Sequence, residues 1–118
     1  MKNSLLCRLE PTSLIYKMKK SESQQLIEDI FLQKDKNRSW QDNYIWLVEE
    51  VGELSRAVRS KNSDNMEEEF ADVYAWLLSL ASILDINLDE VLQKKYGNGC
   101  PKCAKTPCGC RHREEEKE

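Results

Sequence analysis

The stretch WLVEEVGEL, residues 46–54, decides the fold, because it sets three glutamates into an apolar run. On a helical wheel turning by about 100° per residue, the aliphatic residues fall on one side. Glu50 and Glu53 border that apolar side, and Glu49 points further outward. A solvated helix face would not carry this much aliphatic surface, and a plain core would not carry the acids. The stretch therefore predicts an amphipathic helix with an acidic edge.

A second stretch, EEEFADVYAWLLSL at residues 67–80, repeats this layout. Glu69 and Asp72 are three residues apart, so they share one helix face beside an apolar stripe. The turn-like residues SKNSDN separate the two helices, and helices joined by a short turn pack antiparallel. Four acids then meet at the border of the helix–helix interface: Glu50, Glu53, Glu69 and Asp72.

Four ionised carboxylates in one half-buried place repel one another, so a positive group is needed beside them. A hard divalent cation with oxygen ligands meets that need, and Mg²⁺ is the usual one. Because Mg²⁺ often also binds substrate phosphates, the pattern points to phosphate-ester or phosphoanhydride chemistry. The alternative is solvated charge on a helix surface, which is the ordinary reading of a single ExxE pair.

The remaining pattern is helical throughout, with no strand pattern and no internal repeat. Helices are expected over about residues 22–36, 40–60 and 65–84, followed by a short one that Asn87 caps and that ends near Tyr96. Ser21 with Gln24 and Asp64 with Glu67 are the other expected caps. The fold class is all-α, a small bundle of about four helices. We expect a loose extension at residues 1–20, a helical domain at 21–97, and a cysteine knuckle with a charged, disordered tail at 98–118.

Length and composition narrow the function classes. The chain has 118 residues, a length that argues for one domain. Its net charge of −3 argues against nucleic acid as a partner. No apolar run approaches the roughly 20 residues of a membrane span, and the N-terminal residues contain no apolar signal segment. A cytoplasmic location and no membrane partner are therefore expected. The core, of about 75 residues, is marginal in size, so oligomerisation would stabilise it.

Four of the five cysteines lie in GCPKCAKTPCGC, with the spacing C-x2-C-x4-C-x-C. Two close pairs can surround one tetrahedral ion, and Zn²⁺ with four thiolates is the natural candidate for a closed, structural site. The alternatives are an iron–sulfur cluster, a zinc site in which His112 replaces one cysteine as ligand, and free or disulfide-bonded cysteines. Cys7 is expected to be a free thiol. The predicted zinc ligands are Cys100, Cys103, Cys108 and Cys110.

The words EEVGE at 49–53 and EFAD at 69–72 resemble the EExxE…ExxD signature of the MazG-like nucleotide pyrophosphohydrolases. The flanks YIWLVEEVGELSRAV and KKYGNGCPKC extend the similarity over about residues 24–110. The resemblance implies an all-α fold that assembles as homodimers or homotetramers. It implies Mg²⁺-dependent hydrolysis of a nucleoside triphosphate to a monophosphate and pyrophosphate.

By motif position, the resemblance implies that the four acids of the helix border bind Mg²⁺. Glu49 corresponds to the first acid of the motif. Its outward position on the helical wheel suggests either a supporting role beside the metal ligands or orientation of the attacking water, so it is the candidate catalytic residue. Trp76 lies where relatives carry an aromatic that contacts the nucleoside, and Trp46 lies one turn before Glu50; packing in the core is the alternative for both. The final helix departs from an Asn- and Arg-containing motif of many relatives. Lys94 and Lys95 are therefore candidates for phosphate binding, and so are Arg38 and Lys34 from the first loop if a neighbouring subunit closes the site.

Two other functions remain open at this point. A phosphoribosyl-ATP pyrophosphohydrolase belongs to the same superfamily and would differ in its substrate. A zinc-stabilised helical adaptor without catalytic activity would need the cysteine knuckle alone. The paired acids argue against the adaptor, because an adaptor gains nothing from four carboxylates beside its core.

Overall fold

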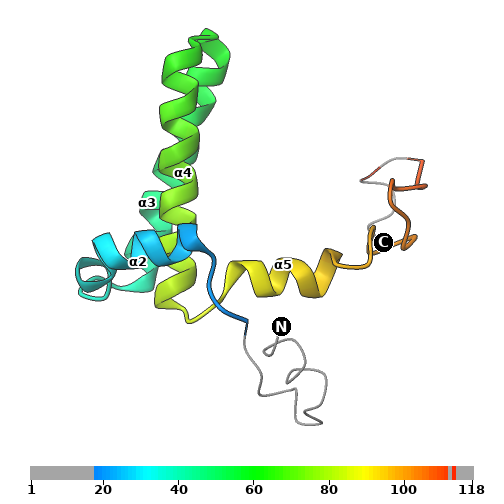
Figure 1. Cartoon of the computed structure of the whole chain (residues 1–118). Coiled ribbons are helices and arrows are strands. Elements are labelled where there is room, and N and C mark those ends of the chain that lie inside the picture. The colour runs from blue at the N-terminus through cyan, green and yellow to red at the C-terminus, as the bar shows by residue number, and fades with distance from the viewer. Residues whose placement is uncertain (1–17, 112, 114–118) are drawn as a thin grey trace. The chain divides into compact units, whose positions relative to one another are not determined.

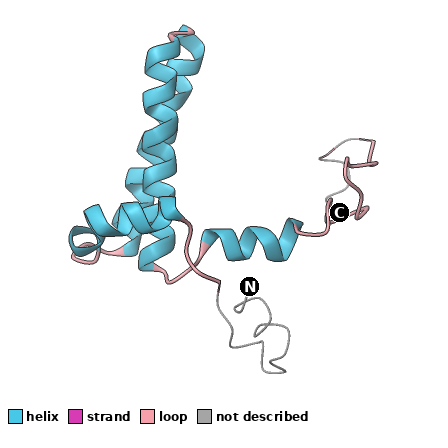
Figure 2. Cartoon of the chain, in the orientation of Figure 1, coloured by secondary structure: helices cyan, strands magenta, loops and turns pink. Residues whose placement is uncertain are grey.

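The computed structural model describes residues 18–111 and residue 113. The described part contains helices and no strand, which confirms the predicted all-α class (Figures 1 and 2). Residues 1–17 with Cys7, His112 and residues 114–118 lie outside the described residues, and so do the expectations for them. The helices are α2 (Glu22–Asp35), α3 (Trp40–Ser60), α4 (Ser63–Ile83) and α5 (Leu88–Tyr96).

Side-chain oxygens cap the first three of these helices. Ser21, Ser39 and Asn62 each accept a hydrogen bond from the backbone N–H three residues later, at 3.0, 3.1 and 3.2 Å. Each cap satisfies one of the N–H groups that a helix start leaves without a partner. The expected cap at Asp64 is wrong: Asn62 takes that role, and α4 therefore begins at Ser63, two residues earlier than predicted.

Helices α3 and α4 form a long hairpin. Each has 21 residues, which corresponds to about 31 Å of helix, and the two run side by side in Figure 1. Only Lys61 and Asn62 connect them. Lys61 has a φ of 60°, the left-handed conformation that commonly ends a helix, so the chain reverses at once. Such a short connection forces the antiparallel packing that the sequence predicted.

Helix α2 packs on α4 at the open end of the hairpin, opposite the connection (Figure 1). The fully buried side chain of Gln24 joins them. Its Nε2 donates to Ser82 Oγ at 3.1 Å and to the carbonyl of Ile86 at 2.9 Å, and its Oε1 accepts from the N–H of Leu88 at 3.0 Å. The Gln24 amide is thus used to hold α2 against the end of α4.

A second buried amide closes the loop between α2 and α3. Asn43 Nδ2 donates to the carbonyls of Asp35 at 3.3 Å and Ser39 at 3.0 Å, and Asn43 Oδ1 accepts from Arg38 at 3.3 Å. Arg38 also pairs with the carboxylate of Asp35 at 3.4 Å. These contacts orient the guanidinium of Arg38.

The apolar core of a single chain is thin. Among the described residues, the buried apolar side chains are Ala57, Leu78 and Ala81. The predicted buried stripe of α3 is only half covered, since Val51 is 47% and Val58 is 48% exposed. Helix α2 covers only one end of the hairpin, so much of the hairpin's apolar surface stays exposed in a single chain.

The chain forms two compact units. Lys20–Leu88 is one, and the residues from Asp89 onward belong to the other. The first contains α2, α3 and α4, and the second contains α5 and the cysteine segment. Among the described helices, none by itself has the length and hydropathy of a membrane span; α4 and α5 meet those criteria only if taken together.

Replacing Gln24 by leucine should destabilise the chain by about 1–3 kcal/mol, because partly buried backbone groups at Ile86 and Leu88 would lose their partner. Urea unfolding followed by circular dichroism measures this. Gln25→Leu is the matched control: its side chain bonds Asp29 on the exposed surface, so the cost should stay within about 0.5 kcal/mol. Equal costs for the two variants would contradict the role assigned to Gln24.

Candidate functional site

The antiparallel register of α3 and α4 brings the acidic motifs together. In a hairpin, residues equally distant along the sequence from the connecting turn lie opposite each other. Counted from Lys61, Glu50 is level with Asp72, Glu53 with Glu69, and Trp46 with Trp76. The two acid pairs of the sequence therefore face each other across the hairpin, with the tryptophan pair one turn away.

Three of the four predicted acids lie within metal-binding range of one another. One carboxylate oxygen from each of Glu50, Glu69 and Asp72 lies within 4.8 Å of the others. Glu53 is outside this group, and its carboxylate pairs with Arg56 on the same helix at 2.9 Å. Arg56 was not among the residues selected from the sequence, although its position three residues after Glu53 is a signal for an ion pair within the helix.

The acids are strained electrostatically. Burial raises the pKa of Glu50, and repulsion from Asp72, Glu69 and Glu53 raises it further. Burial likewise raises the pKa of Glu69, with added repulsion from Asp72. These shifts have the two causes that a cation would counteract, loss of solvent and crowding of like charges.

One oxygen of this cluster has no hydrogen-bond partner. Glu69 Oε1 is buried, and no donor among the described residues reaches it. A buried carboxylate oxygen without a donor is costly, and buried charges in proteins are usually paired or bound to metal. The residues therefore fit a hard divalent cation: the oxygens are carboxylates, they converge, and one of them lacks any other partner.

An aromatic pair adjoins the acids. The rings of Trp46 and Trp76 are stacked, with centroids 5.8 Å apart and an angle of 15° between the planes. The guanidinium of Arg38 lies 5.4 Å from the ring centre of Trp76. Trp46 is 49% exposed, so this pair is not core packing in the single chain. Sequence reasoning selected all three residues but missed Asn43, which positions Arg38.

The other two predicted residues are placed as follows. Glu49 is exposed on α3, next to Glu50, in agreement with its outward position on the helical wheel. Lys94 is exposed in the last turn of α5, and it belongs to the other compact unit.

The four predicted cysteine ligands do converge. Their sulfur atoms all lie within 4.8 Å of one another, and two pairs, Cys100 with Cys110 and Cys103 with Cys108, are 3.9 Å apart. A disulfide needs about 2.05 Å, so these thiols are free. A tetrahedral zinc site with Zn–S bonds of about 2.3 Å has sulfurs about 3.8 Å apart, which these separations match.

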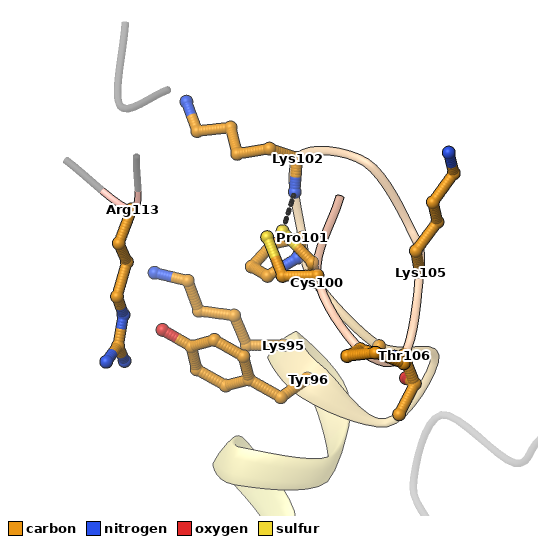
Figure 3. Close-up of a pocket in the computed structure, with 11 residues that line it drawn as sticks. Lys95, Tyr96, Cys100, Pro101, Lys102, Lys105, Thr106 and Arg113 are labelled. Carbon is orange, nitrogen blue, oxygen red and sulfur yellow. Dashed lines mark hydrogen bonds between the residues drawn. The ribbon is translucent and has the colours of Figure 1, made fainter. Parts of the chain in front are cut away.

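Backbone N–H groups point at three of these sulfurs. Lys102 N donates to Cys100 Sγ at 3.4 Å, which Figure 3 shows as a dashed line. Gly109 N donates to Cys103 Sγ at 3.2 Å, and Cys110 N donates to Cys108 Sγ at 3.3 Å. Such donors favour the ionised sulfur, which is the form that binds metal.

The thiols differ in acidity because of these N–H donors and because of burial. The hydrogen bond from Gly109 lowers the pKa of Cys103 to about 6. Burial raises the pKa of Cys110 to about 12, and the neighbouring thiols add to that increase. Without a cation, four thiolates this close repel one another as the carboxylates do.

Glycine is required where the cysteine loop begins. Gly99 has a φ of 102°, a conformation that other residues rarely adopt. A Cβ there would lie 2.7 Å from Thr106 Oγ1 and 3.0 Å from the backbone carbonyl of Lys105. The loop closes tightly around this point, because the N–H of Cys100 donates to that same carbonyl at 3.1 Å.

The fold and this site define a class: an all-α protein with a carboxylate cluster inside a helical hairpin. The sequence matches the model of the MazG nucleotide pyrophosphohydrolase domain over residues 38–104, more than half of the chain. The chain therefore belongs to the MazG nucleotide pyrophosphohydrolase family, which confirms the resemblance. A search among curated proteins found no match to the sequence. The matched region contains Glu49, Glu50, Glu53, Glu69 and Asp72, and it ends within the cysteine segment.

The raised pKa values predict a pH-dependent stability for the metal-free chain. Because Glu50 and Glu69 bind protons more tightly when folded, their contribution to stability is full below the ordinary carboxyl range. It is lost as the pH rises through their raised pKa values. Glu69→Gln removes one such group, so the variant should melt at a higher temperature than the original chain at pH 8 and at nearly the same temperature at pH 4.

Thermal unfolding without divalent ions, followed by circular dichroism, measures this difference. Glu67→Gln is the matched control, since Glu67 is exposed two residues away, and its effect should not vary with pH in this way. If the melting temperatures of Glu69→Gln and the original chain differed by the same amount at both pH values, the acids would not be under repulsive strain.

Proposed function

We propose that this protein is a Mg²⁺-dependent nucleoside triphosphate pyrophosphohydrolase, which converts a ribo- or deoxyribonucleoside triphosphate and water to the monophosphate and pyrophosphate. The observation that carries the proposal is the buried Oε1 of Glu69 within the carboxylate cluster, which has no hydrogen-bond partner in the described part of the chain. Membership of a nucleotide pyrophosphohydrolase family supports the reaction class.

In this proposal the residues that hold Mg²⁺ are Glu50, Glu69 and Asp72, with Glu53 as the fourth. Glu53 lies close enough to raise the pKa of both other glutamates, although it pairs with Arg56 in this structure. Bound Mg²⁺ would supply neutralisation of phosphate charge and polarisation of a phosphoryl oxygen.

Glu49 is the proposed catalytic base. Its exposed carboxylate adjoins the cluster, so it is suited to orient a water and accept its proton. The water oxygen forms a bond to the α-phosphorus as the bond from that phosphorus to the bridging oxygen breaks. Pyrophosphate leaves with the electron pair of that bond, and the proton held by Glu49 passes to solvent.

The tryptophan pair is the proposed base-binding surface. Half of the Trp46 surface is exposed, and an aromatic face can stack on any nucleobase. Arg38, held by Asp35 and Asn43, is the proposed contact for phosphate from this side. Lys94, in the last turn of α5, remains a proposed phosphate-binding residue on the evidence of the sequence alone.

We also propose that the active protein is a cytoplasmic homodimer or homotetramer. Large apolar side chains stay open on the hairpin, among them Val51 at 47%, Phe70 at 58% and Leu77 at 40% exposure. Exposed apolar surface of this extent in a small unit favours a second copy as its cover. Sedimentation velocity at micromolar concentration tests this part of the proposal.

Pyrophosphate release with Mg²⁺, across the common ribo- and deoxyribonucleoside triphosphates and phosphoribosyl-ATP, tests the reaction. Release is expected from one or a few nucleoside triphosphates. Glu50→Gln, Glu69→Gln and Asp72→Asn should each lower kcat/KM about 100-fold or more, because each removes a metal ligand.

Glu67→Gln again serves as the control and should retain activity within about twofold. Release from phosphoribosyl-ATP alone would replace the proposed substrate class. An inactive chain that neither binds Mg²⁺ nor melts at a higher temperature with nucleotide and Mg²⁺ would instead point to a non-catalytic adaptor.

A second metal is proposed for the cysteine segment. We propose that Cys100, Cys103, Cys108 and Cys110 bind one Zn²⁺ in a closed, structural site. The matching sulfur separations and the three N–H···S hydrogen bonds support this assignment. A loop this short cannot build an apolar core, so the ion would provide its folding energy.

Native mass spectrometry should find about one Zn²⁺ per chain, and Cys103→Ser should lose it. Cys7→Ser is the matched control and should keep the ion, because Cys7 lies outside the cysteine segment. Gly99→Ala should weaken zinc binding as well, since its Cβ would collide with Thr106 and Lys105. The zinc assignment fails if the original chain carries no zinc or if Cys7→Ser loses it to the same extent.

A further inference from the structure

The cysteine segment forms one wall of a pocket that the hydrolase mechanism does not use. The pocket has a volume of about 860 Å³ and opens to solvent. Its walls come from the end of α5, the cysteine loop and residue 113, so it lies wholly within one compact unit. The polar side chains that line it are Lys95, Tyr96, Lys102, Lys105, Thr106 and Arg113.

The charge around this pocket is one-sided. The segment from Val91 to Arg113 contains six basic residues and no acidic one, although the whole chain has a net charge of −3. Four of the six basic side chains line the pocket. A zinc ion with four thiolates would leave a net charge of about −2, which these cations exceed.

None of the four pocket cations has a carboxylate partner among the described residues. The ion pairs that the described residues form all lie outside the pocket, on α2, on α3 and on the residues beside them. Figure 3 shows the Lys95 ammonium, the Tyr96 hydroxyl and the Arg113 guanidinium on the same side of the pocket. Lys95 lies along the Tyr96 ring, with its nitrogen 5.7 Å from the ring centre. Cations that gather without a counter-charge raise the local concentration of anions.

We propose that this pocket is a second binding site, specific for phosphate groups of a polyanionic ligand. An arginine fork and lysine point charges are the donors that recognise phosphate oxygens. The site would be held in shape by the zinc loop, so the inference rests on the zinc assignment proposed above. Two sources share this chemistry: a free polyphosphate chain, as in a nucleotide or pyrophosphate, and the phosphodiester backbone of a nucleic acid.

The carboxylate cluster allows the two sites to be measured separately. Without Mg²⁺, its acids repel an anion instead of binding it. Binding of inorganic tripolyphosphate in Mg²⁺-free buffer therefore reports chiefly on the pocket, because this probe carries no base for the tryptophans and the acids oppose its approach to Arg38. Glu69→Gln, which should lower the kcat/KM of pyrophosphate release about 100-fold or more, should bind the probe as the original chain does.

The experiment is isothermal titration calorimetry of the full-length, zinc-loaded protein with tripolyphosphate at low salt without Mg²⁺. Lys95→Gln and Arg113→Gln should each weaken binding about five- to tenfold, as expected for loss of one charged hydrogen bond. Arg59→Gln is the control: it removes the same charge from the exposed surface of α3 and should change the affinity less than twofold.

A parallel titration with a single-stranded oligothymidylate identifies the source. In one outcome, the oligonucleotide binds more tightly than tripolyphosphate, and Arg113→Gln reduces the slope of its log affinity against log salt concentration by about one. That result would identify the phosphodiester backbone of a nucleic acid as the ligand. Tripolyphosphate binding that equals or exceeds it would assign a free polyphosphate. The proposal is overturned if neither probe binds, or if Arg59→Gln weakens binding as much as the pocket variants. A chain without hydrolase activity that still binds the probe would sink the proposed function and leave this inference standing.

Discussion

The antiparallel register of α3 and α4 is the constraint on which the site depends. A connection of two residues, Lys61 and Asn62, leaves the hairpin no freedom to slide. Every pair equally far from that connection is then brought level, so Glu50 meets Asp72 and Trp46 meets Trp76. A shift of the connection by one residue would separate these pairs by about 1.5 Å and rotate them by about 100°. The order of residues around one turn thus sets the geometry of the whole acidic face.

The same face stores an electrostatic cost. Burial and mutual repulsion raise the pKa of Glu50 and Glu69, and Glu69 Oε1 has no donor among the residues that the structure describes. Folding without a cation must bear this cost, and functional sites are where proteins commonly accept it. The buried amides of Gln24 and Asn43 act in the opposite sense, because each is fully hydrogen-bonded and fixes a helix end.

The two compact units achieve order by different means. The helical unit has length but a thin core, with Ala57, Leu78 and Ala81 as its buried apolar residues. Its open apolar faces favour association. None of the described residues of the unit that holds the cysteines is buried, and its loop is closed by backbone hydrogen bonds around four converging sulfurs. A metal and a partner subunit are the two remedies that small domains use, and this chain has the features for both.

The sequence by itself determined the helices, because their periodicity and caps are local properties. It also indicated which acids share a face, since spacings of three and four residues act within one helix. The four cysteines were predictable as a group for the same reason: they are close in sequence and separated by turn-forming residues. The start of α4 was misplaced by two residues because Asn62 and Asp64 offered competing caps.

Tertiary structure alone decided the remainder. Glu53 pairs with Arg56 while its three neighbours converge, and that choice depends on the positions of oxygens across two helices. The partners of Gln24 lie about sixty residues away in the sequence, so no local pattern could predict them. The exposure of Val51 and Val58 likewise follows from how many helices are present to cover them. Burial and long-range contact are properties of the packed chain, and one-dimensional patterns state only which residues are able to take part in them.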